Sequence, residues 1–429
     1  MRLRRSNRLI PMFVALLIAM LRCSPDETAT ETEAPRDLTV DEDEASRLRA
    51  LGYASVSGES SQAVGVVHHD PNASQPGLNL FTNAHGCSAQ LVSAAGAVLR
   101  SWSHEPCQMW GNTILLADGG LLVVHQSPRL DRVPKRRREE FEGTPASELR
   151  DLLRFDATGQ LLWERRAPVH HDVELTPDGR IATLTYAHRL VPDIHPQAPV
   201  KDHAVAIFDT DGSLLDQLWL LDLLRTAPKP FALKPIEAHW SRPEGIDEVD
   251  LIHANSIEWM RWTGLFDSGP LYGPSHFVMS LRNQDTVLIA DWKTRRVLWT
   301  WGQGQISGPH DATLLRNGNV LVFDNGLGRG WSRVVEVDPR TDELVWEYRA
   351  PEGETFFSAT RGAAQRLANG NTLITDSERG RVFEVTPSGE VVWDFRNPNR
   401  DGEGRPYIIV RMRRLPEPLT PDGPFTWSD

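Results

Sequence analysis

Short apolar stretches that end at turns recur along most of the chain. In the first type, a turn is followed by an apolar run that ends near a tryptophan, and the six copies end at Trp102, Trp163, Trp219, Trp299, Trp346 and Trp393. In the second type, a tight turn joins two apolar runs, and its central dipeptides are Asp178-Gly179, Asn317-Gly318 and Asn369-Gly370. Asn-Gly and Asp-Gly favour hairpins because both central residues tolerate a positive φ. The pattern therefore predicts a repeated unit of short antiparallel strands.

Each unit has four such strands, with the tryptophan on the outermost one, and this arrangement at a blade-sized period is typical of a β-propeller. Six tryptophans predict six blades. Residues 78–102 supply outer strands without an inner partner, and residues 407–415 supply a strand without outer ones. Pairing the two would close the ring and leave no open sheet edge. The sequence predicts an all-β fold, a six-bladed β-propeller of four-stranded antiparallel blades over residues 63–416, followed by a C-terminal tail at 417–429.

The N-terminus has the pattern of an export segment, which we place at residues 1–23. Several arginines precede an apolar run at 9–21 that is too short to span a bilayer as a stop-transfer helix. Cys23 follows, and residues 24–62 form an acidic, disordered linker that can hold one short helix. The arrangement resembles a bacterial lipoprotein with a lipidated Cys23, although Arg22 departs from the small residue preferred there. We expect an exported protein of the periplasm or cell envelope.

Composition argues against one class of partner and bears on whether the cysteines form a disulfide. The chain has 46 Lys and Arg against 58 Asp and Glu, a formal net charge of −12, and this acidic balance argues against a nucleic-acid binder. Beyond Cys23, only Cys87 and Cys107 remain. In an exported protein they are a reasonable disulfide pair, and two buried thiols are the alternative.

Three histidines share a position relative to the repeats. His171 and His310 each precede the glycine of the following hairpin turn by eight residues, and the next residues are Asp172 and Asp311. His253 begins the inner strand of the blade between them. Three successive blades thus place an imidazole at the start of the innermost strand, where side chains face the central channel. The alternative is that the His-Asp pairs only brace the junctions between blades.

Two arginines accompany these histidines. Arg282 ends the second strand of the blade of His253, and the matching inner-strand start of a later blade contains Thr360 and Arg361, which we take as substrate-binding candidates. Three imidazoles with one or two guanidinium groups form a compact cationic site, which fits a tetrahedral oxyanion. Four other histidines are expected in loops or on the surface: His170, His188, His195 and His203.

Taken together, these motifs resemble the bacterial arylsulfate sulfotransferases, which are exported six-bladed propellers. The resemblance is best over residues 163–393 and rests on His171-Asp172, His253-Ala-Asn255, Ser280-Leu-Arg282, Gly308-Pro-His310-Asp311 and the run from Arg361 to Gly370. It implies ping-pong transfer of a sulfuryl group from a phenolic sulfate ester to a phenol, without a nucleotide donor and without a cofactor. The implied partners are a small aryl sulfate donor and a phenolic acceptor, with membrane contact only through the N-terminus.

The resemblance also implies roles for individual residues. His310 becomes transiently sulfated as the nucleophile, while His171, His253, Arg282 and Asn255 hold the sulfuryl oxygens. The chain departs from the family in two respects. Residues 26–77 leave no room for the β-sandwich that known members can carry before the propeller, and the cysteines lie in the first strands, away from the reactive histidine.

Two other functions fit parts of the pattern. Three histidines on a propeller axis can bind Zn²⁺ with an open position, as in propeller lyases and lactonases. Arg282 argues against this, because a cation beside the metal weakens its binding. The second alternative is a propeller without catalytic activity that binds sulfated or phenolic ligands, or another envelope protein. The pattern supports a quinoprotein even less, because no dehydrogenase residues accompany the tryptophan repeat.

Overall fold

The structure is a computed structural model that describes residues 63–127, 150–241 and 246–415. The predicted export segment, Cys23, the acidic linker and the C-terminal tail lie outside the described residues. No helix within the described ranges is long and apolar enough to cross a membrane.

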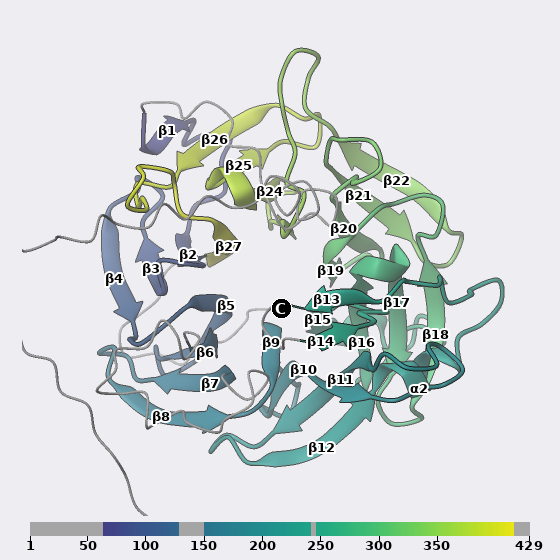
Figure 1. Ribbon diagram of the computed structural model, residues 1–429. Coiled ribbons are helices and arrows are strands. Elements are labelled where there is room, and N and C mark those ends of the chain that lie inside the picture. The colour runs from purple at the N-terminus through teal and green to yellow at the C-terminus, as the bar shows by residue number, and fades with distance from the viewer. Residues whose placement is uncertain (1–62, 128–149, 242–245, 416–429) are drawn as a thin grey trace, which may run out of the picture. The chain divides into compact units, whose positions relative to one another are not determined.

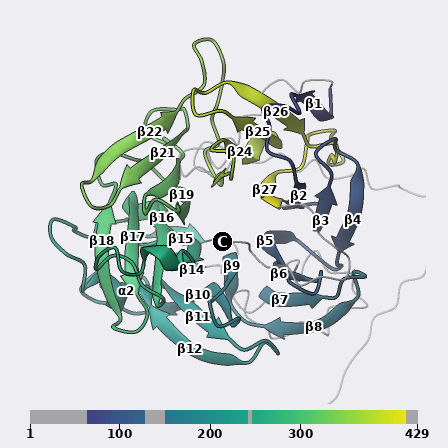
Figure 2. The same cartoon turned by 180° about the vertical axis from the view of Figure 1, so that it is seen from behind.

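Six antiparallel sheets, the blades, are arranged around a common axis (Figures 1 and 2). In the description of each blade below, the strands are given in order from the innermost outward. Blade 1 consists of β27 (Ile409–Leu415), β2 (Leu78–Asn83), β3 (Ser88–Val92) and β4 (Val98–Ser103), and blade 2 of β5 (Met109–Leu115), β6 (Leu121–Gln126), β7 (Arg150–Phe155) and β8 (Leu161–Arg166). Blade 3 consists of β9 (Val169–Leu175), β10 (Ile181–Arg189), β11 (Val200–Phe208) and β12 (Leu214–Trp219), and blade 4 of β15 (Ala254–Trp259), β16 (His276–Leu281), β17 (Thr286–Asp291) and β18 (Arg296–Trp301). Blade 5 consists of β19 (His310–Leu314), β20 (Val320–Asp324), β21 (Arg333–Asp338) and β22 (Glu343–Tyr348), and blade 6 of β23 (Ala363–Arg366), β24 (Thr372–Asp376), β25 (Arg381–Val385) and β26 (Val391–Arg396). The predicted six-bladed β-propeller is confirmed.

The ring closes as the sequence predicts. The C-terminal strand β27 pairs antiparallel with β2 and becomes the inner strand of blade 1, with Leu78 opposite Leu415. The N-terminal strand β1 (Gly65–His69) pairs with β26 and adds a fifth strand outside blade 6. Two separate pairings therefore join blades 1 and 6 through the ends of the chain, and they protect the sheet edges that an open ring would expose.

The repeated tryptophans all lie on the fourth strand of their blades, which is the outermost strand except in blade 6, where β1 lies outside β26. Trp102, Trp299 and Trp393 are buried, and the other three are partly buried. Trp393 and Phe395 are both on β26, with ring centroids 5.9 Å apart, and their cluster also contains Phe81 and Met412 of blade 1. Trp102 and Trp299 likewise pack in clusters with residues of the next blade, so these buried tryptophans are packing residues of the blade junctions.

The connection between blades 3 and 4 contains structure that the strand pattern does not predict. A short helix, α2 (Leu220–Leu224), follows β12 directly, and a two-stranded hairpin of β13 (His239–Ser241) and β14 (Ile246–Glu248) comes next. Within the described residues, short 3₁₀ helices are found at η3 (Thr263–Leu265), η4 (Arg282–Gln284) and η5 (Ser377–Arg379).

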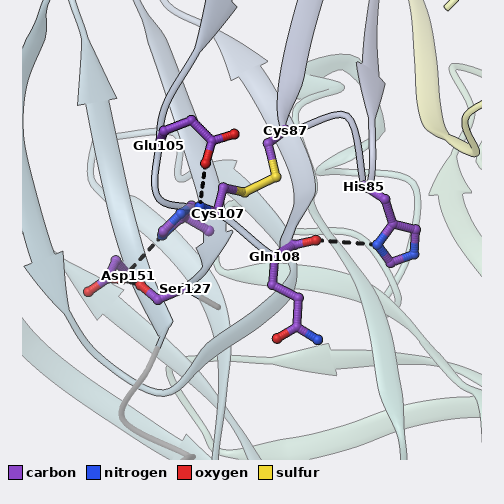
Figure 3. The surroundings of a disulfide bond; sticks show 8 residues. His85, Cys87, Glu105, Cys107, Gln108, Ser127 and Asp151 are labelled. Carbon is purple, nitrogen blue, oxygen red and sulfur yellow. Dashed lines mark hydrogen bonds and ion pairs between the residues drawn. A yellow bond between two sulfur atoms is a disulfide. The ribbon is translucent and has the colours of Figure 1, made fainter. Parts of the chain in front are cut away.

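A disulfide joins the first two blades. Cys87 immediately precedes β3, Cys107 lies two residues before β5, and their sulfur atoms are bonded, with the Cα atoms 6.2 Å apart (Figure 3). The Glu105 carboxylate accepts a hydrogen bond from the Cys107 backbone N–H at 2.9 Å, which fixes the loop beside the bond. The bond therefore restrains the position of blade 2 against blade 1.

Candidate active site

The inner strands share an irregularity at the same end of the propeller. In blades 1 to 5, the pairing of the inner strand with the second strand shifts register near the start of the inner strand. Such bulges re-aim side chains and are common beside functional sites. Near these bulges three residues other than glycine have a positive φ, His171 (58°), His253 (48°) and Asp311 (47°), and so does Arg361 (62°) just before the inner strand of blade 6, which has no bulge. This backbone conformation costs roughly 1–3 kcal/mol per residue, and such strain concentrates where side chains must point in a set direction.

The bulges bring together the four residues on which the sequence prediction depends. His171 lies on β9, His253 immediately precedes β15, His310 begins β19, and Arg282 begins η4 at the end of β16. The starts of inner strands and the ends of second strands meet at one end of an antiparallel blade, so all four lie at that end. The His171 and His253 ring centroids are 5.1 Å apart. The charge of Arg282 lowers the pKa values of both His253 and His310, after burial as the larger cause.

His310 is held as a neutral imidazole with a defined tautomer. Its Nδ1 lies 2.8 Å from the side-chain oxygen of Asn325 and 3.1 Å from the carbonyl of Gly308. Asn325 donates its amide protons to the carbonyls of Ser358 and Arg361, so its oxygen must face His310. The proton of His310 is therefore on Nδ1, and Nε2 carries a lone pair, which accepts the backbone N–H of Arg361 at 3.2 Å. Burial, followed by the charge of Arg282, lowers the pKa of His310 to about 3.

His253 has a different partner. Its Nδ1 lies 2.5 Å from a carboxylate oxygen of Asp250. Burial lowers the pKa of His253, and Asp250 opposes this shift. Burial alone would raise the pKa of Asp250, but His253 and His203 hold it well below its usual range. Asp250 is therefore a carboxylate enclosed by imidazoles.

His171 is partly exposed, and its ring meets other imidazoles. The His170 and His171 ring centroids are 4.9 Å apart. Burial and the neighbouring His170 and His253 lower the pKa of His171 well below its ordinary value. At neutral pH the site thus presents three uncharged imidazoles and one guanidinium group.

The remaining predicted residues lie around this cluster, and their side chains have protein partners. Asn255 donates its amide N–H to the carbonyl of Pro309 at 3.0 Å and accepts a hydrogen bond from Ser280. The Thr360 hydroxyl donates to Glu378 at 2.6 Å. Arg361 approaches His310 through its backbone, while its guanidinium contacts the sulfur of Met109 at 3.1 Å. These contacts anchor the segments that carry His310 and Arg361.

A second layer of charges lies one residue further along the strands. Arg411, on β27, binds both carboxylate oxygens of Asp172 at 3.1 Å and one oxygen of Asp311 at 2.5 Å. Both aspartates also accept backbone N–H groups from inner strands of other blades, Asp172 from Ile257 and Asp311 from Ala364. The aspartates of the two His-Asp pairs therefore brace blade junctions.

The prediction that His170 and His203 lie in loops or on the surface is wrong. Their exposed fractions are 3% and 1%, and they lie on β9 and β11, with ring centroids 4.6 Å apart. His203 stands within the apolar run of a strand, which was a signal for burial. Sequence reasoning also assigned no role to Asp250, Asn325 or Arg411. Within the described ranges, no three His, Cys, Asp or Glu side chains are grouped so that they could hold a metal ion.

The fold and the site together describe a six-bladed propeller that carries three imidazoles and a guanidinium group at one end of its inner strands. The family whose sequence model matches this chain is described as arylsulfotransferase (ASST), and the match covers residues 151–398. The chain belongs to this family. The matched region contains every residue of the cluster and supports an arylsulfotransferase-type function acting on small aryl substrates.

Comparison with solved structures finds chains of low similarity. A protein of unknown function from Bacteroides caccae is 13% identical, with a TM-score of 0.48 over 79% of this chain and 98% of that one. Inactive virginiamycin B lyase from Staphylococcus aureus is 10% identical, with a TM-score of 0.41 over 78% and 88%. Hydrazine synthase from Kuenenia stuttgartiensis is 12% identical, with a TM-score of 0.42 over 78% and 80%. No curated protein matches the chain significantly.

Proposed function

We propose that this protein transfers a sulfuryl group from a phenolic sulfate ester to a phenol through a sulfated His310. The single observation that carries the proposal is the state of His310. Its Nδ1 proton is fixed by Asn325 and Gly308, its pKa is lowered to about 3, and its Nε2 lone pair is on the side of Arg361. A neutral imidazole with a defined lone pair is the form that acts as a nucleophile.

In the first half of the reaction, Nε2 of His310 attacks the sulfur atom of the donor. The S–N bond forms while the bond between sulfur and the aryl oxygen breaks, and its electron pair leaves with the phenolic oxygen. In the second half, the oxygen of the acceptor phenol attacks the same sulfur atom and the S–N bond breaks. In the structure Nε2 accepts a hydrogen bond from the Arg361 N–H at 3.2 Å, and this bond must break before Nε2 can attack the sulfur atom.

Charge stabilisation would come from groups already held in place. Negative charge in such a transition state spreads over the equatorial sulfuryl oxygens, and fixed donors aimed at them lower its energy. Arg282, His171 and His253 are the donors that we assign to this task. One amide N–H of Asn255 holds the carbonyl of Pro309, the residue before His310, and Asn255 would act at least in part by fixing this segment.

The test is incubation of the purified protein with 4-nitrophenyl sulfate, with and without a phenol acceptor. We expect transfer with the acceptor and, without it, a covalent adduct with the mass of one SO₃ group that peptide mapping assigns to His310. The His195→Gln variant, which alters a loop histidine, should form the same adduct. Wild-type protein that forms neither adduct nor product with a range of aryl sulfates would rule out the proposal, and stoichiometric zinc in active protein would favour the metal-dependent alternative.

We also propose that the protein is exported and works in the periplasm or cell envelope. The Cys87–Cys107 disulfide supports this, because such bonds persist in oxidising compartments. Cys23 is the candidate lipid anchor. Fractionation of cells that express wild-type and Cys23→Ser protein tests both points: the anchor predicts release of the variant from the membrane fraction, and equal distribution would contradict it.

A further inference from the structure

The two imidazoles whose pKa values Arg282 lowers are held by chemically different groups. Nδ1 of His310 faces an amide oxygen of Asn325, whereas Nδ1 of His253 faces a carboxylate of Asp250. An amide oxygen keeps the Nδ1 proton in place without adding charge. A carboxylate also stabilises a second proton on the ring, because it attracts the imidazolium. The two rings therefore have different capacities for protons.

The loop that carries Asp250 and His253 is fixed by η4 along its whole length. All four carbonyl oxygens of residues 250–253 accept hydrogen bonds from this short helix. The bonds run from Asn283 Nδ2 to Asp250 at 2.6 Å, Gln284 Nε2 to Leu251 at 2.6 Å, Asn283 N to Ile252 at 3.2 Å and Arg282 N to His253 at 3.1 Å. The carboxylate and the imidazole are thus held in one geometry relative to Arg282.

A second imidazole lies behind the carboxylate. His203 accepts the backbone N–H of Ala254 at its Nδ1, at 3.2 Å, so its own proton is on Nε2. That Nε2 faces the other oxygen of Asp250 at 3.4 Å. His203 and Asp250 are both almost fully buried, with exposed fractions of 1% and 3%. The order His203–Asp250–His253 leads from the interior of blade 3 to the site.

We propose that Asp250, supported by His203, makes His253 the acid–base residue of the transfer, with Asp250 and His203 as positioning residues. The assignment rests on the proposed function. His171 does not have this role, since no carboxylate faces its ring nitrogens within the described parts of the chain.

The proton balance of the cycle follows from this arrangement. When an acceptor phenol attacks the sulfated His310, its hydroxyl proton passes to Nε2 of His253, and the imidazolium pairs with the Asp250 carboxylate. When the next donor reacts, the bond between sulfur and the aryl oxygen breaks, and the phenolic oxygen takes that proton from His253. One proton is taken and one is returned in each cycle, so no further reactant is needed.

Several charged or titratable groups face His253, and they set the pH range of this exchange. Asp250 favours the protonated ring, while burial and the cation of Arg282 oppose it. The neighbouring rings belong to His171, His203 and His310. A bound sulfate ester brings a negative charge that offsets Arg282, and this allows His253 to hold a proton during turnover.

The test compares donors whose leaving phenols differ in pKa. A nitrophenolate leaves without a proton, whereas an unsubstituted phenolate needs one, and general acid catalysis is worth typically about 10²–10⁴-fold. We therefore expect Asp250→Asn to lose about 10²-fold or more in the rate of His310 sulfation by phenyl sulfate and less than about threefold with 4-nitrophenyl sulfate. Single-turnover kinetics of adduct formation measure both rates.

Matched variants separate this role from a structural one. Asp151→Asn removes another buried carboxylate that faces a histidine, His125, in blade 2, and it should affect both donors equally. His203→Ala should show the donor-dependent loss in weaker form, and His203→Gln, which can present an amide N–H to Asp250, should regain part of it. Equal losses with both donors in Asp250→Asn would overturn the assignment while leaving the proposed function intact. No adduct in the wild type overturns the function itself.

Discussion

Two layers of side chains lie next to each other at the propeller axis, and they come from adjacent residues of the same strands. The outer layer contains His171 and His310, which are uncharged at neutral pH because burial lowers their pKa values. The inner layer contains Asp172 and Asp311, which bind Arg411 and the backbones of other blades. One His-Asp dipeptide therefore supplies a residue for the proposed chemistry and a residue that joins the blades.

The two layers differ in how their charges are compensated. The ions of the inner layer are paired, and removing one partner would leave a buried charge without compensation. In the outer layer, three imidazoles stay neutral around the cation of Arg282, so an incoming anion completes the charge balance. The contrast predicts that changes in the outer layer affect activity and that changes in the inner layer affect stability.

The largest expected effect tests the outer layer. His310→Ala should lower sulfuryl transfer by at least about 10³-fold, because it removes the attacking nitrogen. The variant should remain folded, with a midpoint of unfolding in urea close to that of the wild type. Transfer assays and urea titrations of the same preparation measure both quantities. A variant that retains wild-type transfer would contradict the assignment of the outer layer to activity.

The next effect tests the inner layer. Arg411→Met should lower the free energy of unfolding by about 3–5 kcal/mol, because Asp172 and Asp311 lose their shared cation in a buried site. Arg405→Met removes an exposed ion pair with Asp401 and should leave the midpoint nearly unchanged. Denaturant titrations give both values, and equal midpoints for the two variants would contradict the assigned role of the inner layer.

The smallest effect concerns pH. His310 has a pKa of about 3 in the folded state against about 6.5 when unfolded, so the unfolded chain binds more protons between these values. Stability is therefore lost as the pH falls below about 6.5, and His310 accounts for about 2 kcal/mol between pH 7 and pH 5.

The variant His310→Gln should lose this part of the acid sensitivity. Its free energy of unfolding should fall less than that of the wild type on going from pH 7 to pH 5. Asp376 and Glu258, whose pKa values burial raises to about 7, act in the opposite direction but equally in both proteins. Parallel curves for the two proteins would show that His310 is not held neutral.

The fold could be predicted from the sequence because its signals are local and repeated. The tryptophans of the outer strands pack between blades, and the Asn-Gly and Asp-Gly turns fix the hairpins. Helix α2 escaped prediction because Leu220–Leu224 continues the apolar run of β12, and a short apolar run does not distinguish strand from helix.

The site could be predicted only in part. The register of His171 and His310 follows from counting back from a turn, which requires no knowledge of packing. The partners of the histidines do not follow, because they depend on which segments the folded chain brings together. Asn325 reaches His310 from the end of β20, and His203 reaches Asp250 from the third strand of blade 3.

The place of Arg411 in the chain has a consequence for maturation. It lies on β27, which joins the ring only after more than 400 preceding residues have been synthesised. Until then the inner layer lacks Arg411, the cation that Asp172 and Asp311 share, and the ring is open. We expect a nascent polypeptide stopped before residue 409 to be inactive and readily cut in limited proteolysis, so that the protein acquires its chemistry only when the last strand is in place.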